Sequence, residues 1–286
     1  MKFEVLNQMF SNQTLRALVQ NHSYIKIDEA YSEFIQDNTH KSSLEKLKAL
    51  YKVLQKKYRN EYYFKNMLLN KLLLGKHSVH TTTALSEMPI GKSIADFILI
   101  NKKAEVYEIK TALDSLNRLE QQIEDYYKVF NHVSIVTDQS HVEKIKKHYS
   151  NSSVGIYVLT KRNTLHEVQK STPYFENLDI ESMYKFLRKP ERTKVLKALN
   201  LSLPAYTDFT EYKVLLEVFK RCDIFDVYNL MLKQLKKRNR FQKFEKEFLE
   251  SPKELKYLLY FNKLNHKETQ KLYELMKEDE GCTIHI

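Results

Sequence analysis

Two short apolar runs separated by Asn-Lys-Lys constrain this chain more than any other feature. The runs cover residues 93–100 and 104–111, and the tight polar turn between them predicts an antiparallel hairpin. If Ile100 pairs with Ala104, the register places Asp96 opposite Glu108. Side chains directly opposite on one face lie about 5 Å apart, so two facing carboxylates repel each other. A bound divalent cation would remove this repulsion, because hard cations take oxygen ligands.

The segment before the hairpin predicts a third strand with a further carboxylate. A four-residue loop containing Gly91 would join this strand to the first run and would place Glu87 opposite Asp96. Lys110 would point to the same face as Glu108, because strand side chains alternate. The register therefore predicts one row of carboxylates across three strands. A slip of one residue in either hairpin would break the row.

This part of the chain resembles the metal-binding core of the PD-(D/E)XK nuclease superfamily. The residues that carry the resemblance are Asp96, then Glu108-Ile109-Lys110, then Gln122 to Tyr126, with Glu61 on a preceding helix. Gln122 and Tyr126 are similar to the Gln-x-x-x-Tyr motif of the RecB-like branch. Within the superfamily the chain looks most like an uncharacterised group of bacterial and phage proteins with a Tyr-Glu-Ile-Lys strand. The resemblance covers residues 55–160, and Ala95 stands where the proline of the family motif would be.

The resemblance implies a Mg²⁺-dependent nuclease that also accepts Mn²⁺ in place of Mg²⁺. Expected metal ligands are Asp96, Glu108, the Ile109 carbonyl and Glu61, and the hairpin register adds Glu87 as a weaker candidate. Lys110 would assist the reaction, while Gln122 and Tyr126 would border the site. The catalytic set implied is therefore Glu61, Asp96, Glu108, Lys110, Gln122 and Tyr126.

Several of these residues also have ordinary structural interpretations. Glu61 opens a predicted helix, where an acidic side chain is favourable for the helix dipole. Gln122 and Tyr126 share one helix face at i and i+4, and the simpler interpretation is a surface glutamine beside a tyrosine at the edge of the core. His77 and His80 have no carboxylate pattern around them and are expected in a loop or on the surface.

Composition and charge limit the class of protein. The 286 residues are 42% hydrophobic, enough for a core, and the net charge of +11 favours a polyanionic partner. Cys222 and Cys282 lie far apart, which predicts neither a zinc site nor a disulfide framework and favours a reducing compartment. The first residues lack the apolar region of a signal peptide, and no apolar run reaches membrane-spanning length. A cytoplasmic protein without a membrane partner is expected.

The order of predicted elements indicates an α/β fold. Residues 1–43 are expected to form a helical extension, and residues 44–165 a nuclease-like domain. Its order α-β-β-β-α-β-α-β matches the mixed sheet with an αβββαβ core of restriction-endonuclease-like folds. The sequence after Lys161 is expected to form a loop through Pro173, and the region beyond it to be almost free of strands. Residues 175–286 are expected to form an all-α C-terminal domain.

The C-terminal region contains the most basic stretch of the chain. Its cations are interleaved with Phe241 and Phe244, as on a surface that binds nucleic acid. The alternative is a solvated helix face with two core aromatics. Two capping patterns, at Ser251 and Asn265, predict the starts of the last two helices. The expected nucleic-acid-binding residues are Lys233, Lys236, Lys237, Arg238, Arg240 and Lys243.

Two function classes follow from these observations. The first is a Mg²⁺-dependent phosphodiesterase that acts on DNA, with RNA less favoured, and a dimer is one arrangement left open. The second is a non-catalytic nucleic-acid-binding or regulatory protein on a nuclease-like fold. A purely structural helical scaffold ranks last, because it leaves the carboxylates unexplained.

Overall fold

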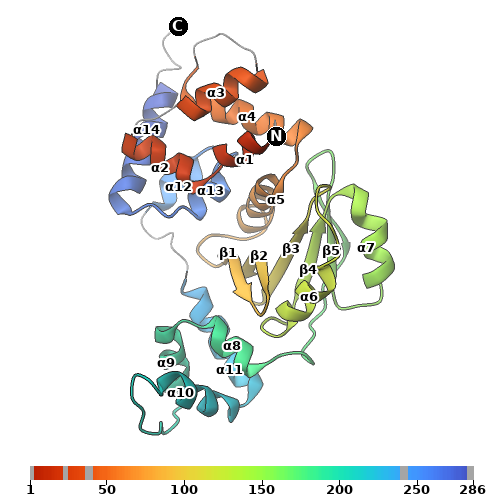
Figure 1. Cartoon of the computed structure of the whole chain (residues 1–286), viewed down its shortest axis with the longest axis vertical. Helices are drawn as coiled ribbons and strands as arrows, with labels where there is room; N and C mark the ends of the chain where they lie inside the picture. The colour runs from red at the N-terminus through yellow and green to blue at the C-terminus, as the bar shows by residue number, and fades with distance from the viewer. Residues whose placement is uncertain (1–2, 22–24, 36–40, 239–243, 282–286) are drawn as a thin grey trace. The chain divides into compact units, whose positions relative to one another are not determined.

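The chain forms two compact units. The computed structural model describes residues 3–21, 25–35, 41–238 and 244–281 (Figure 1). One unit, the helical unit, combines Met1–Leu72 with Arg240–Ile286, and the other, the sheet unit, covers Leu73–Asn239. This division differs from the expected three domains. The region expected as one C-terminal domain is shared between the units, and its second half belongs with the N-terminal helices.

A six-stranded mixed sheet forms the centre of the sheet unit. The strands lie in the order of the sequence, with β3–β4 and β4–β5 parallel and the other neighbours antiparallel. Their bounds are β1 Thr83–Ile90, β2 Ser93–Ile100, β3 Ala104–Lys110, β4 Val133–Thr137, β5 Gly155–Leu159 and β6 Leu165–Gln169. The mixed sheet confirms the α/β class. The antiparallel edge strand β6 falls where a loop was predicted, and that prediction was wrong.

The two hairpins have the predicted register. Ile100 pairs with Ala104 across the β2–β3 turn. In the first hairpin Ile90 pairs with Ser93, so the turn contains two residues rather than the predicted four. Gly91 in this turn has φ +60°, a conformation that suits two-residue hairpin turns and that only glycine adopts without strain.

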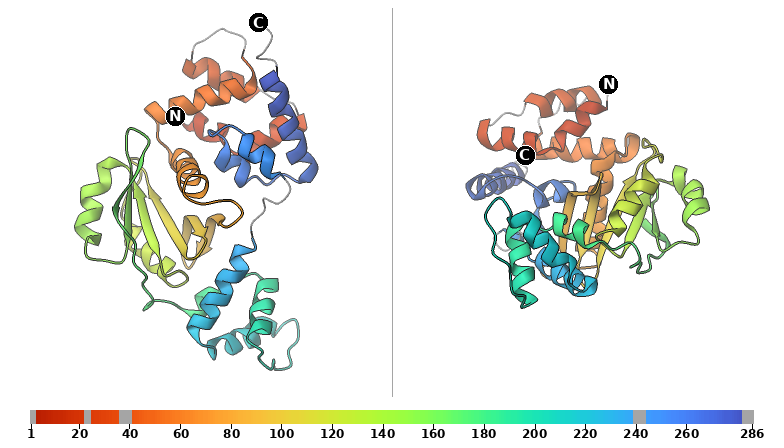
Figure 2. Two further views of the ribbon diagram at one scale, coloured as in Figure 1. Left: turned by 180° about the vertical axis from the view of Figure 1, so that it is seen from behind. Right: turned by 60° about the horizontal axis from the view of Figure 1, so that its bottom comes forward.

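The helices of the sheet unit pack into one continuous apolar core with the strands. The Phe130 and Phe186 rings lie 5.3 Å apart, and the Tyr228 hydroxyl donates to Asn131 Oδ1 at 2.6 Å. These contacts join the later helices to the region around β4. The helices, seen again in Figure 2, are α6 Leu119–Tyr127, the short 3₁₀ helix η2 Gln139–His141, α7 Val142–Tyr149, α8 Ile180–Phe186, α9 Lys189–Ala198, α10 Glu211–Lys220 and α11 Ile224–Lys236.

The described part of the helical unit consists of helices from both ends of the chain. They are α1 Glu4–Met9, α2 Asn12–Asn21, α3 Ile25–Ile35, α4 Ser43–Lys57, α5 Glu61–Leu68, α12 Glu245–Glu250, α13 Lys256–Tyr260 and α14 His266–Gly281. A π-helical turn, η1 Leu69–Leu74, follows α5. Asn66 joins the two segments: its side chain donates to Lys253 O at 2.9 Å and accepts from Tyr257 N at 2.9 Å.

The predicted capping patterns had different outcomes. Asn265 and Glu268 exchange hydrogen bonds at the start of α14, as predicted. The predicted helix start at Ser251 was wrong, because the Ser251 hydroxyl donates back to Phe248 O and α13 begins only at Lys256.

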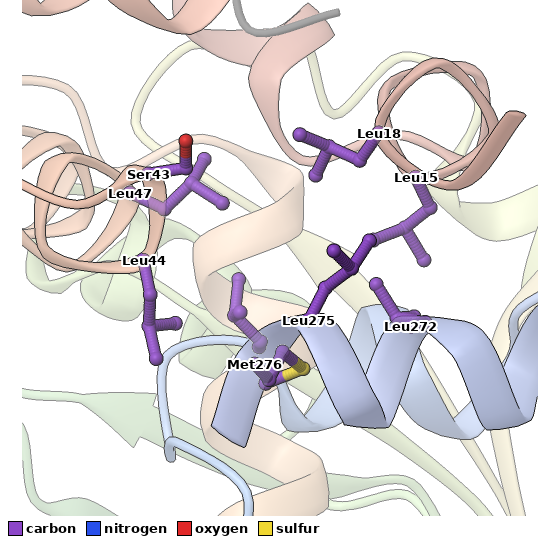
Figure 3. Close-up of a pocket in the computed structure, with 9 residues that line it drawn as sticks. Leu15, Leu18, Ser43, Leu44, Leu47, Leu272, Leu275 and Met276 are labelled. Carbon is purple, nitrogen blue, oxygen red and sulfur yellow. The ribbon is translucent and has the colours of Figure 1, made fainter. Parts of the chain in front are cut away.

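Mostly leucine side chains line a small pocket of the helical unit (Figure 3). They leave a cavity of about 30 Å³ between α2, α4 and α14, lined by Leu15, Leu18, Leu44, Leu47, Leu272, Leu275 and Met276, together with Ser43 and Leu255. This space holds one water-sized probe at most, so it is a packing gap rather than a ligand site. No described helix is both long and apolar enough to cross a membrane.

Candidate functional site

Asp96 and Glu108 lie on neighbouring strands, on the face that α6 covers. Cα pairing of β2 and β3 reaches Phe97 and Tyr107, one residue short of the two carboxylates. Beyond this point Asp96 replaces the ladder bond, because its Oδ2 accepts from the Ile109 N–H at 2.8 Å. The backbone of β3 therefore fixes the Asp96 carboxylate beside the strand that carries Glu108.

Glu108 is the centre of a buried polar cluster. Its side chain is almost completely enclosed, with the residue 1% exposed. Lys110 Nζ donates to Glu108 Oε1 at 2.8 Å, and the Tyr126 hydroxyl lies 2.5 Å from Glu108 Oε2. Lys110 Nζ also donates to Gln122 Oε1 at 2.8 Å. We call Asp96, Glu108, Lys110, Gln122 and Tyr126 the Glu108 cluster.

The turn between β1 and β2 holds α6 in place above this cluster. Asp125 of α6 accepts hydrogen bonds from the Lys92 N–H at 3.2 Å and the Ser93 hydroxyl at 2.9 Å. A Cβ atom at Gly91 would lie 2.7 Å from Asp125 Oδ1, so only glycine allows this close approach. Asp125 was not among the predicted site residues, although a glycine in a predicted turn is a signal that another group approaches the backbone there.

Burial and charge shape the electrostatics of the cluster. Burial raises the pKa of Glu108, and the neighbouring Lys110 and Tyr126 only partly oppose this shift. Burial also raises the pKa of Tyr126, and the negative charges of Glu108 and Asp96 raise it further. Both carboxylates are therefore close enough to the Tyr126 hydroxyl to disfavour its ionisation. Two carboxylates and one ammonium give the cluster a formal charge of −1.

Of the remaining expected metal ligands, Glu87 does not join the cluster, and Glu61 lies in the other unit. Glu87 is exposed and has φ +54°, an unusual conformation that interrupts the regular alternation of β1. Glu61 belongs to the helical unit, where it forms an ion pair with Lys65 Nζ at 2.5 Å. Across the described ranges, no group of three or more His, Cys, Asp or Glu side chains is arranged to hold a metal ion. The predicted row of three carboxylates was therefore wrong.

The remaining donors are nevertheless suited to Mg²⁺. This ion is commonly held by one or two carboxylates, with waters and substrate phosphates completing its coordination. Both Glu108 oxygens already accept one hydrogen bond, and each carboxylate oxygen has two lone pairs. Asp96 and Glu108, with the carbonyl of Ile109 as the further ligand expected, are the residues that would hold the ion.

The expected nucleic-acid-binding residues have different environments. Lys233, Lys236 and Lys237 are exposed along α11 and at its end. The Arg238 side chain is only 6% exposed and makes two hydrogen bonds with Glu191, at 2.7 and 2.5 Å. Arg238 therefore stabilises the sheet unit rather than offering a free cation. Arg240 and Lys243 lie outside the described residues.

The fold and the cluster define an α/β protein with a mixed six-stranded sheet and a buried carboxylate–lysine site. A family model described as bacteriophage P4 protein cII matches residues 54–266, which is more than half of the chain. The chain belongs to this family. Searches of the curated proteins and of the solved structures returned no match.

Proposed function

We propose that the protein is a Mg²⁺-dependent nuclease of the PD-(D/E)XK type with a restriction-endonuclease-like αβββαβ core. The observation that supports this proposal best is the meeting of β3 and α6 at Glu108. Lys110 lies between Glu108 and Gln122, and Tyr126 holds the other Glu108 oxygen. These four residues come from two separate sequence motifs, and an amphipathic strand or helix would not by itself bring them together.

The residues of the chain have distinct roles in this proposal. A Mg²⁺ ion held by Asp96 and Glu108 would supply a Lewis acid for the scissile phosphate and a more acidic bound water. Lys110 carries a positive charge that can stabilise negative charge developing on the phosphate oxygens. Gln122 fixes the direction of the Lys110 ammonium group, and Tyr126 fixes the Glu108 carboxylate. Ordered hydrogen-bond partners of this kind, one acceptor and one donor, reduce the reorganisation required in the transition state.

The charge of the chain supports a nucleic-acid substrate. The net charge is +11, and three exposed lysines, Lys233, Lys236 and Lys237, follow one another on α11 and its end. Cations of this kind bind phosphate without reading the base sequence. We favour DNA as the substrate over RNA.

Cleavage assays test the proposal directly. Purified protein is incubated with plasmid, linear duplex and single-stranded DNA, and with RNA, each with Mg²⁺, with Mn²⁺ or with a chelator. We expect metal-dependent cleavage that is lost in Asp96→Ala and Glu108→Ala. Glu143→Ala, which removes a carboxylate whose side chain is 85% exposed on α7, is the matched control and should cleave normally. Equal rates in the wild-type protein and both site variants would reject the nuclease.

One observation favours a second function, a binding or regulatory protein on the same fold. Both Glu108 oxygens are already satisfied by Lys110 and Tyr126, so the cluster is complete without a metal. Calorimetry with Mn²⁺ separates the two functions. A nuclease gives a saturable heat that disappears in Asp96→Ala, whereas a binding protein gives DNA binding without any heat from the metal.

A further inference from the structure

A second hollow lies on α6, on residues that the Glu108 cluster does not use. It has a volume of about 400 Å³ and is formed by α6, the end of α7, the segment before β5 and the segment before α8. This volume is within the range of small-molecule sites in proteins. Its walls include Glu120, Glu124, Tyr127, Tyr149, Tyr174 and Asn177, and none of its lining residues is Lys, Arg or His. The hollow is therefore acidic, within a chain that is basic as a whole.

The two carboxylates of the hollow, Glu120 and Glu124, form no ion pair with a basic side chain among the described residues. Glu120 and Glu124 are one helical turn apart, a spacing at which like charges lie on one face and repel each other. Neither forms a hydrogen bond or an ion pair with any described residue, and both are exposed. Burial raises the pKa of Tyr149, and the negative charges of Glu120 and Glu124 raise it further. Both carboxylates therefore act on the same tyrosine at the wall of the hollow.

Three tyrosines, Tyr127, Tyr149 and Tyr174, line the hollow beside the carboxylates. The rings of Tyr127 and Tyr174 meet edge to face, with centroids 4.8 Å apart at 62°. Tyr127 is 5% exposed, and its buried hydroxyl has no hydrogen-bond partner among the described residues. A buried polar atom without a partner is rare in folded proteins and frequently marks a place where a water or a ligand completes the structure.

We propose that this hollow binds a short organic dication, such as an aliphatic diamine. Two uncompensated carboxylates supply two negative charges, and the faces of the tyrosine rings attract ammonium groups. A bare metal ion is a poorer fit, because two exposed carboxylates on the rim leave its remaining coordination to water. Nucleic acid is excluded from the hollow, since phosphates would meet Glu120 and Glu124. This site is independent of the proposed nuclease activity.

Calorimetry with 1,4-diaminobutane on nucleic-acid-free protein tests the proposal. We expect saturable binding of one molecule per chain that weakens as NaCl is added, because charge pairing with exposed carboxylates is screened by salt. Butylamine, with one charge, should bind about two- to fivefold more weakly, and 1,4-butanediol should not bind. Nα-acetyl-arginine methylamide, added in a separate experiment, tells whether a protein side chain can take the place of a free amine. Absence of binding by the diamine would overturn the proposal.

Variants locate the site. Glu120→Gln and Glu124→Gln should each weaken diamine binding by about two- to fivefold, and the double variant should weaken it by more than either single change. Both changes keep the side-chain size and break no described hydrogen bond, so the fold should be retained, which circular dichroism checks. Glu143→Gln on α7 is the control and should bind like the wild-type protein. Equal affinity of the double variant and the control would place the diamine elsewhere and would reject this site. None of these results depends on cleavage of DNA.

Discussion

The Gln122 side-chain oxygen lies 2.8 Å from Lys110 Nζ and so connects α6 to the end of β3. The same ammonium group donates to Glu108 Oε1, and this second bond gives it a defined direction. An ammonium group has three donors, so one remains for a substrate oxygen. Gln122 is in this way a positioning residue for Lys110.

Replacing Gln122 should lower the rate of cleavage without unfolding the protein. In Gln122→Ala the Lys110 ammonium loses one of its two acceptors, and a misplacement of about 1 Å costs up to about 100-fold in rate. We expect a 10- to 100-fold lower kcat with a smaller change in KM. Gln121→Ala, the exposed neighbour on α6, should have normal kinetics. Equal effects of Gln122→Ala and Gln121→Ala on kcat would show that Gln122 does not position Lys110.

As the pH is lowered, the affinity for Mn²⁺ should begin to fall at a higher pH than the ordinary pKa of a glutamate would predict. Burial raises the pKa of Glu108, so its proton is released only at a pH above the usual 4.5. Metal binding requires the carboxylate, and affinity should therefore decrease as the pH falls through this raised value. Calorimetric titrations between about pH 4 and 8 measure the midpoint. If the affinity for Mn²⁺ instead fell with a midpoint at or below pH 4.5, the pKa of Glu108 would not be raised by burial.

Gly91→Ala should destabilise the sheet unit. The change forces alanine to φ +60° and brings its Cβ to 2.7 Å from Asp125 Oδ1. Together these effects should cost about 1–3 kcal/mol. Urea denaturation measures the loss, and hydrogen exchange should show faster opening at the β1–β2 turn. Lys92→Ala keeps the backbone bond to Asp125 and should change little. The double variant Gly91→Ala with Asp125→Ala removes the clash between the new Cβ and the Asp125 carboxylate. The backbone strain at φ +60° remains in this variant.

The two kinds of basic residue on α11 should respond differently to substitution. Changing Lys233, Lys236 and Lys237 together to Gln should reduce the salt dependence of DNA binding, with the slope of log K against log salt smaller by about two to three. Arg238→Gln should instead destabilise the fold by about 1–3 kcal/mol, because it removes the charged partner of the half-buried Glu191 and leaves that carboxylate only the Arg188 N–H. Filter binding at several salt concentrations and thermal denaturation separate the two effects. An unchanged slope in the triple variant would exclude α11 from the DNA-binding surface.

The helical unit should become more stable between pH 8 and 10. Lys256 is 5% exposed and donates to Leu249 O at 2.9 Å and to Phe248 O, and burial lowers its pKa to about 8. The unfolded chain, with the ordinary value of 10.5, holds the proton more strongly, so stability rises with pH across this interval. We expect a gain of about 1–2 kcal/mol from pH 7.5 to 9.5 in urea denaturation. Lys256→Met should remove the gain, and Lys267→Met on the exposed side of α14 should retain it.

Local patterns predicted the strands around the site well. The register of the β2–β3 hairpin follows from its short polar turn, which pairs Ile100 with Ala104 and thereby Ile98 with Val106. The β1–β2 turn was predicted too long, because Ile90 and Ser93 extend the strands by one pair. β6 was missed because Leu165–Gln169 contains exposed and half-buried residues, as an edge strand does, and carries no apolar run.

Contacts between distant segments account for what the sequence could not predict. Asn66 bonds to Lys253 and Tyr257, so the last helices belong with the first ones, and no local pattern contains this information. The diamine site depends on Glu124, Tyr149 and Tyr174, which come from three separate segments. By contrast, Gln122 and Tyr126 could be predicted to share a helix face, because their spacing of four residues places them there.

The helical unit is assembled from two stretches of chain that the whole sheet unit separates in sequence. During translation α5 is therefore synthesised long before α13. Asn66 can form its hydrogen bonds with Lys253 and Tyr257 only after most of the polypeptide has been made. The sheet unit is contiguous and can mature first on the ribosome. A chain that ends at residue 239 should consequently still fold its sheet unit. Its N-terminal helices should remain exposed and incompletely packed, because the C-terminal helices that complete their unit are missing.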